Sequence, residues 1–158
     1  METVIERHGG TILEYVGDAI LAVFGAPGDL DDHARAATQC ALEMREALTE
    51  FNAEMEKQGI SDTWRDQGFQ DLGARIGVHK GYVVAGTLGG TNQVRYSVLG
   101  DTVNVAARLE AYNKELGTEI LISDAVYEAL GSEFIVEATD HGPILLKGRS
   151  AEQHCYSL

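Results

Sequence analysis

The sequence predicts an α+β domain in which helices pack on a largely antiparallel sheet. Short β-rich runs bounded by glycine turn signals alternate with three segments of helical periodicity, which is the element order of that class. The 158 residues suit one domain, and 44% hydrophobic with 23% charged residues is the composition of a globular protein with a sizeable core. No internal repeat is present, so repeat architectures are excluded.

The first predicted element is a β-hairpin within residues 9–25. Its two β-rich runs flank Gly17 and Asp18, and a Gly-Asp pair is typical of a two-residue type II′ turn. Asp18 is therefore expected at the hairpin tip. A turn aspartate is by itself an ordinary solvated turn former.

A long amphipathic helix is predicted over residues 32–57. Asp32 stands at its N-cap and Gly59 just past its end, as helix termini favour. The apolar positions recur at steps of four and three: Ala37, Ala41, Met44, Leu48, Phe51 and Met55. Residues 61–71 are polar and contain the single tryptophan, so a loop or an excursion off the domain is predicted there.

The middle of the chain is predicted to hold further strands. The β-rich runs 74–80 and 82–88 meet at Gly81 and form a second strand pair, and residues 89–92 carry a turn signal. Another short β run follows at 94–99.

Helix and strand alternate in the last third of the chain. A helical stripe begins at Thr102 and ends near Gly117. Ser123 is the predicted N-cap of a short helix over 123–130. Strands are predicted over residues 119–122, 133–138, 143–147 and 154–158.

The net charge excludes some classes of partner. The chain carries 12 Lys and Arg against 25 Asp and Glu, a formal charge of −13. Nucleic-acid wrapping and binding to an anionic membrane are disfavoured, because both depend on basic side chains. An anionic ligand would have to be held by metal ions, by a few placed Arg or Lys side chains, or by helix N-termini.

Cysteine usage and hydropathy indicate a cytoplasmic protein, or a cytoplasmic domain of a longer membrane or multidomain protein. Cys40 and Cys155 fit no metal-ligand spacing and are interpreted as reduced thiols. The longest apolar stretch, residues 19–24, is too short to span a bilayer, and the first residues lack the pattern of a secretion signal.

Two polar side chains share one face of the predicted helix that begins at Thr102. Asn104 and Arg108 are four residues apart, so both project from the same side. Taken alone, this pair is well explained as a surface arginine beside a capping asparagine.

The surrounding residues favour a functional role for the pair. The run Gly100-Asp-Thr-Val-Asn-x-Ala-x-Arg-Leu109 resembles the signature helix of class III nucleotidyl cyclases, the adenylyl and guanylyl cyclases. Blocks at residues 9–25, 77–86 and 145–148 are similar to that family in the same order. The resemblance covers nearly the whole chain and implies a ferredoxin-like cyclase catalytic domain that makes 3′,5′-cyclic nucleotides from nucleoside triphosphates.

The resemblance also implies roles for individual residues. Asp18 would be one of two carboxylates that hold two divalent ions, Mg²⁺ or Mn²⁺. Arg108 would contact the α-phosphate, and Asn104 would orient the ribose. Lys147 would contact the β- and γ-phosphates, with Arg149 as a competitor for that role.

Two positions bear on the choice of base. In the family, adenine-reading enzymes usually have Lys at the position of Glu14 and Asp or Thr at that of Ser97. A Glu14 carboxylate can accept from N1–H and N2–H₂ of guanine while the Ser97 hydroxyl donates to O6. The pair therefore favours GTP over ATP by about tenfold to a hundredfold. An ATP-using adenylyl cyclase is the alternative.

The resemblance further implies a homodimer with the active site at the interface. Asp18 of one chain would act with Glu14, Ser97, Asn104, Arg108 and Lys147 of its partner.

One family block has no counterpart in the chain. The family begins with a strand F-x-D-I-x-G-F-T that carries the first metal aspartate, whereas residues 1–8 correspond to the end of the helix before the hairpin. Residues 1–158 are thus expected to be a single cyclase domain truncated at its N-terminus. Exposed sheet edges would favour pairing or strand exchange with another chain. The alternative function is a catalytically silent nucleotide-binding or dimerisation module.

Overall fold

The computed structural model describes residues 1–68, 71–90, 93–132, 134 and 137–158. Its elements are α1 (Glu2–Arg7), β1 (Gly10–Val16), β2 (Ala19–Phe24), α2 (His33–Lys57), α3 (Ile60–Asp66), β3 (Ile76–Val78), β4 (Val84–Gly90), β5 (Gln93–Leu99), α4 (Asp101–Leu116), β6 (Ile120–Ser123), α5 (Asp124–Leu130), β7 (Thr139–Ile144) and β8 (Gln153–Ser157). Helices pack on mostly antiparallel strand pairs, which confirms the predicted α+β class.

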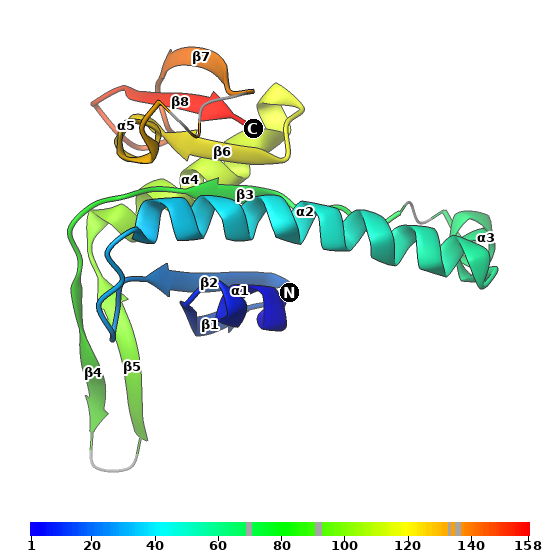
Figure 1. Ribbon diagram of the computed structural model, residues 1–158, viewed down its shortest axis with the longest axis horizontal. Helices are drawn as coiled ribbons and strands as arrows, with labels where there is room; N and C mark the ends of the chain where they lie inside the picture. The colour runs from blue at the N-terminus through cyan, green and yellow to red at the C-terminus, as the bar shows by residue number, and fades with distance from the viewer. Residues whose placement is uncertain (69–70, 91–92, 133, 135–136) are drawn as a thin grey trace.

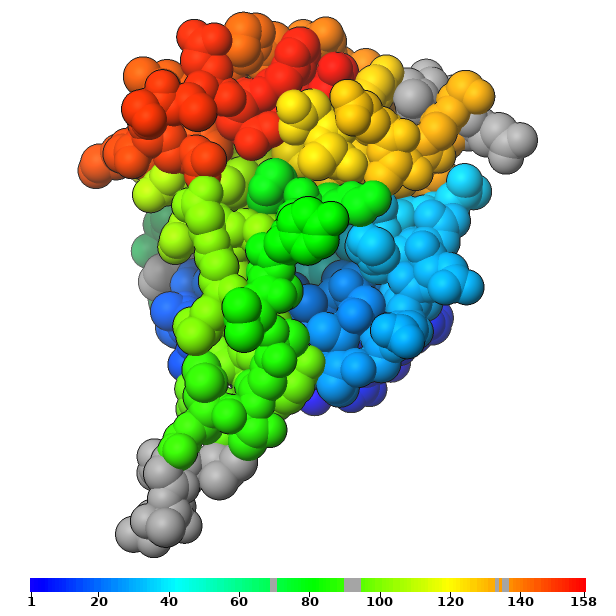
Figure 2. All heavy atoms as spheres, turned by 90° about the vertical axis from the view of Figure 1, so that its left-hand side faces the viewer, coloured from blue at the N-terminus to red at the C-terminus, as the bar shows by residue number. Residues whose placement is uncertain are grey.

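The described strands form three sheets. β1 pairs with β2, β4 pairs with β5, and a four-stranded sheet has the order β3-β6-β8-β7. Figure 1 shows α2 running between the β1–β2 hairpin and the four-stranded sheet. The β4–β5 hairpin, which we call the arm, projects away from the rest of the molecule (Figures 1 and 2).

The predicted N-terminal hairpin is confirmed. Val16 pairs with Ala19, so Gly17 and Asp18 form a two-residue turn, and Gly17 has the positive φ of +64° that a type II′ turn requires at its first position. The register shifts between Ile12 and Glu14, which indicates a β-bulge that strict alternation does not predict.

The long helix is confirmed, and α3 follows it at the end of α2 that points away from the sheets (Figure 1), so the predicted excursion fits and the predicted loop is wrong over 61–66. Asp32 is the N-cap of α2, and Gly59 lies beyond the last turn with φ +71°. The chain re-enters a helix as α3 instead of forming a loop over 61–66. Ser61 is 2% exposed and Asp62 lies 3.7 Å from Arg65, so burial and an ion pair support a turn that polar composition concealed.

The predicted pairing of runs 74–80 and 82–88 is also wrong. β3 is three residues long and pairs in parallel with β6, while β4 pairs with β5. Gly81 permits a close approach, because a Cβ there would lie 2.6 Å from Thr102 Oγ1. Of the predicted turn at 89–92, positions 91 and 92 lie outside the described residues.

The C-terminal third matches the prediction except around β7. α4, β6, α5 and β8 all form within a residue or so of the expected bounds. The strand predicted over 133–138 is absent at the positions described there, and the strand predicted over 143–147 shares only two residues with β7. Pro143 is tolerated in β7 because this strand lies at a sheet edge.

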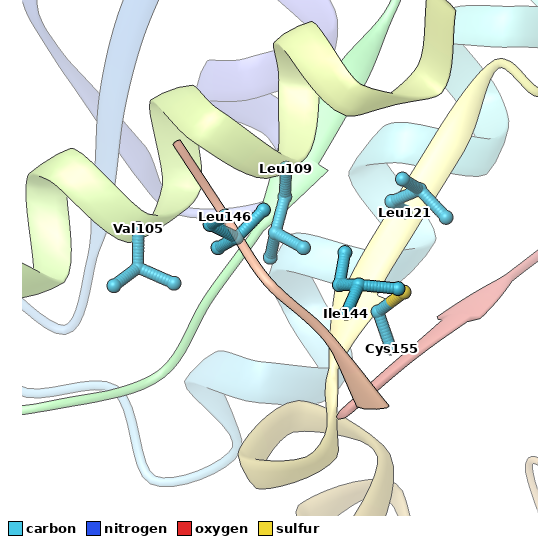
Figure 3. Close-up of a cluster of buried hydrophobic side chains, with 6 residues drawn as sticks. All are labelled: Val105, Leu109, Leu121, Ile144, Leu146 and Cys155. Atoms are coloured by element: carbon cyan, nitrogen blue, oxygen red, sulfur yellow. The ribbon is translucent and has the colours of Figure 1, made fainter. Parts of the chain in front are cut away.

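The densest packing lies under β6 and α4. All four residues of β6 are buried, and α4 contributes Val105 and Leu109 to the same core. Figure 3 shows these α4 side chains packed with Leu146, Ile144 and their neighbours. Within the described part of the chain, no helix combines the length and the apolar character that a bilayer crossing requires.

Candidate functional site

Helix α4 carries the Asn104–Arg108 pair on a firmly seated face. Val105 and Leu109 are 2% and 0% exposed, so they fix the rotation of the helix about its axis. Asn104 is exposed and Arg108 is half-buried, one position away from each buried anchor. A Cβ at Gly77 would collide with the Ala106 carbonyl, so the α4 backbone lies directly on β3. The structure confirms that both predicted side chains leave the same helix face.

The Lys147 turn lies against this helix. Leu146 is 1% exposed and belongs to the same core cluster as Val105 and Leu109 (Figure 3). Lys147, the next residue, is exposed to solvent. A Cβ built on Gly148 would lie 3.7 Å from Arg108 Nη2, so the turn passes beside the Arg108 guanidinium. The backbone next to Lys147 thus lies beside Arg108, 40 positions earlier in the sequence.

Arg149 is engaged elsewhere. Its guanidinium donates to the carboxylate of Asp101 at the start of α4, and its side chain is 24% exposed. Its backbone N–H donates to the Leu146 carbonyl at 3.0 Å, which closes the turn. Of the two competing cations, Lys147 is therefore the one whose charge has no protein partner among the described residues.

Glu14 and Ser97 are linked through a residue that sequence reasoning missed. Arg95 Nη1 donates to Glu14 Oε1 at 2.6 Å, which ties β1 to β5 of the arm. Ser97 follows Arg95 by two residues on the same strand, so both leave β5 on the same side. The i, i+2 spacing of Arg95 and Ser97 is a local signal that places both on one side of the strand. The contact of Arg95 with Glu14 has no local signal, because the two residues are 81 positions apart.

Asp18 stands apart from these residues. It is exposed at the β1–β2 turn, and no hydrogen bond or ion pair joins it to the other described residues. No group of three or more His, Cys, Asp or Glu side chains that could hold a metal occurs in the described part of the chain. Mg²⁺ at nucleotide sites is bound by one or two carboxylates plus phosphates. Asp18 fits as one such ligand, but the described residues do not form the expected two-ion site by themselves.

A side-chain hydrogen bond joins His79 to Ser123, the last residue of β6. His79 Nδ1 is 2.8 Å from Ser123 Oγ, so the Ser123 hydroxyl faces the histidine and makes no cap bond to α5. Burial lowers the pKa of His79, and the Arg149 cation lowers it further, against the opposite effects of Asp124 and Asp101. His79 is thus expected to stay neutral near pH 7.

The family model of the adenylate and guanylate cyclase catalytic domain matches residues 1–158. Adenylate cyclase 1 of Rhizobium meliloti (strain 1021) is 36% identical over 155 residues, which are 98% of this chain and 22% of that protein. Receptor-type guanylate cyclase gcy-28 of Caenorhabditis elegans is 31% identical over 140 residues, 89% of this chain and 10% of that protein. The chain therefore spans less than a quarter of the length of these curated relatives.

Solved structures agree with the sequence relatives. The guanylyl cyclase Cya2 superposes with a TM-score of 0.76 at 33% identity, over 99% of this chain and 73% of that chain. The guanylate cyclase domain of RhGC from Catenaria anguillulae, solved in complex with GTP, gives a TM-score of 0.72 at 29% identity, over 98% of this chain and 75% of that chain.

Proposed function

Because the chain belongs to the adenylate and guanylate cyclase catalytic domain family, we propose that it is a nucleotide cyclase that converts GTP, in preference to ATP, to the 3′,5′-cyclic nucleotide and pyrophosphate. The class III cyclase fold expected from the sequence is confirmed by the structural relatives. One observation carries the proposal: Asn104, Arg108 and the Lys147 turn converge on one face of α4.

The proposed reaction is an in-line transfer within one nucleotide. The ribose 3′-oxygen loses its proton and bonds to the α-phosphorus, while the bond from that phosphorus to the bridging oxygen of pyrophosphate breaks. The Arg108 guanidinium is suited to the charge that builds up on the α-phosphate, and Asn104 to orienting the ribose. Lys147 matches the leaving pyrophosphate as a point charge.

Asp18 is proposed to supply one carboxylate to a divalent ion, Mg²⁺ or Mn²⁺. When bound with the nucleotide, such an ion neutralises the triphosphate and favours ionisation of the 3′-hydroxyl.

The preference for guanine is supported by the Glu14–Arg95 contact. Arg95 occupies Oε1 of the carboxylate, so Oε2 can accept from N1–H or N2–H₂ of guanine. Adenine presents an acceptor at N1, which a carboxylate acceptor cannot satisfy. The half-buried Ser97 hydroxyl lies on the strand that also holds Arg95 and can donate to O6.

A homodimer with two shared active sites completes the proposal. Asp18 makes no contact with the α4 residues, and the arm exposes apolar side chains that a second chain could cover, with Val84, Leu99 and Leu88 exposed by 73%, 55% and 44%. We propose that Asp18 of one chain acts with the α4 residues of its partner, with strand exchange as a possible mode of pairing.

Turnover with Mn²⁺ and either GTP or ATP, measured for the purified chain and for the same chain extended N-terminally by its genomic upstream sequence, tests the activity. Cyclic GTP should be the main product, and Glu14→Lys with Ser97→Asp should shift the preference toward ATP. Nucleotide binding without turnover by either form would support the silent binding module instead. An unchanged preference in the double variant would refute the assignment of these residues to base recognition.

Mixing two inactive variants tests the shared site. Asp18→Asn and Arg108→Met chains should each be inactive, but their heterodimer contains one intact site. Mixing should therefore restore up to about a quarter of wild-type activity, as random pairing of equal amounts predicts. No recovery in a mixture shown to form heterodimers would refute the shared site.

A further inference from the structure

The turn that carries Lys147 is anchored at both ends. Leu146 is buried in the core against Val105 and Leu109, and Arg149 pairs with Asp101 on the same helix. A hydrogen bond of 3.0 Å from the Arg149 N–H to the Leu146 carbonyl joins the two anchors. Lys147 and Gly148 lie between them, and Gly148 passes beside Arg108.

The ion-pair anchor lies on the helix face that carries the site. Asp101 precedes Asn104 by three residues and Arg108 by seven, so the three lie along one side of α4. The Asp101–Arg149 pair therefore joins the turn to the helix at the level of the phosphate-binding residues. We propose that this ion pair is a clamp that positions Lys147 relative to Arg108, so that both cations reach one triphosphate. This inference rests on the proposed function.

Charge gives the clamp a second effect. Asp101 lies in the first turn of α4, where the positive end of the helix favours anions. Its carboxylate would repel a bound triphosphate, and the Arg149 guanidinium neutralises it. Loss of Arg149 releases one end of the turn and leaves a negative charge beside the site. Loss of both partners releases the turn without leaving that charge.

A second ion pair on the same helix provides the matched control. Arg75 Nε lies 3.1 Å from Glu110 Oε1, and the two side chains are 49% and 40% exposed. This pair joins α4 to the residue before β3, on a part of the helix that carries no proposed substrate contact. If any surface ion pair on α4 had the same effect, Arg75→Gln would reproduce the loss of Arg149.

The experiment compares Arg149→Met, Arg149→Lys, Asp101→Asn, the double variant Asp101→Asn with Arg149→Met, and Arg75→Gln. The readouts are kcat and KM for GTP with Mn²⁺, the Kd of a fluorescent GTP analogue, and hydrogen exchange of the Arg149 amide. Arg149→Met should raise KM and Kd about tenfold with a smaller change in kcat, and should speed exchange. The double variant should bind GTP more tightly than Arg149→Met, and Arg149→Lys should recover part of the loss.

Three results would overturn the clamp. They are an unchanged KM and Kd in Arg149→Met, an equal loss in Arg75→Gln, and an amide at position 149 that exchanges in Arg149→Met as it does in the wild type. Wild-type protein that neither binds the analogue nor turns over GTP or ATP would instead refute the proposed function, and the clamp with it. Binding by wild type with no effect of Arg149→Met would refute the clamp alone.

Discussion

The phosphate side and the base side of the proposed site are built in different ways. Asn104, Arg108 and Lys147 are each adjacent to a side chain that is at most 2% exposed, so the core fixes their backbone. Glu14 and Asp18 lie on the β1–β2 hairpin with exposed side chains, and Ser97 lies on the projecting arm. The contrast teaches that core packing within one chain holds the proposed phosphate-binding residues, whereas a contact between two hairpins holds Glu14 on the base side.

The largest expected effect lies on the phosphate side. Arg108→Met should lower kcat about a hundredfold to a thousandfold, because the Arg108 guanidinium is the group proposed to stabilise the charge that develops on the α-phosphate. The thermal melting temperature should change little, since Arg108 is not part of the core. Steady-state kinetics and calorimetry on the same preparation measure both. A loss of activity matched by a loss of stability would contradict the assignment.

Core packing beneath the phosphate side should dominate stability. Leu109→Ala removes a fully buried side chain from under Arg108 and should lower the free energy of unfolding by about 2–5 kcal/mol. Leu145→Ala is the matched control, because Leu145 is 61% exposed and should change stability by less than about 0.5 kcal/mol. Urea unfolding measures both variants. Equal effects would show that α4 is not seated as described.

A smaller and more selective effect is expected on the base side. Arg95→Gln removes the donor that holds the Glu14 carboxylate in place. It should therefore reduce the ratio of GTP to ATP kcat/KM by about tenfold, with little change in stability. The control is Arg65→Gln. Arg65 is an exposed cation on α3, outside the proposed site, and its Nη2 lies 3.2 Å from Asp71 Oδ1. If Arg95→Gln lowers both activities equally, Arg95 does not act through base recognition.

The smallest expected effect is a pH dependence of stability that arises from His79. The folded-state pKa of His79 lies below its ordinary value of 6.5, so the unfolded chain binds more protons as the pH falls below that value. Its stabilising contribution is thus present above pH 6.5 and is lost toward the folded pKa. His79→Gln should flatten the decline in unfolding free energy below pH 6.5. A wild-type slope in that variant would exclude His79 as its source.

Features with strong local signals were predictable from the sequence. The 25-residue helix α2 has sustained apolar spacing, the first hairpin has a Gly-Asp turn, and the four-residue step from Asn104 to Arg108 defines a helix face. The pairing of β3 with β6 was not predictable, because it joins residues 44 positions apart, Ile76 with Ile120 for example. Short helix α3 and edge strand β7 also lacked a clear pattern.

The residues of the candidate site show the same difference between local and tertiary signals. Its helix residues followed from spacing, and the Lys147 turn followed from the family resemblance. The partners Arg95 and Arg149 were not identified in those roles, since a charged residue finds its partner only after the chain has folded. Local pattern thus indicates which side chains could act, while tertiary contacts decide how they are held.

The span of the two ion pairs has a kinetic consequence. Asp101 and Arg149 are 48 positions apart, and Glu14 and Arg95 are 81 apart. Helices form within about a microsecond, whereas contacts that close long loops must first overcome chain entropy. During refolding from denaturant, the far-ultraviolet signal of α2 and α4 should therefore return before the capacity to bind nucleotide. A newly made chain would pass through a helical stage that cannot yet hold its substrate.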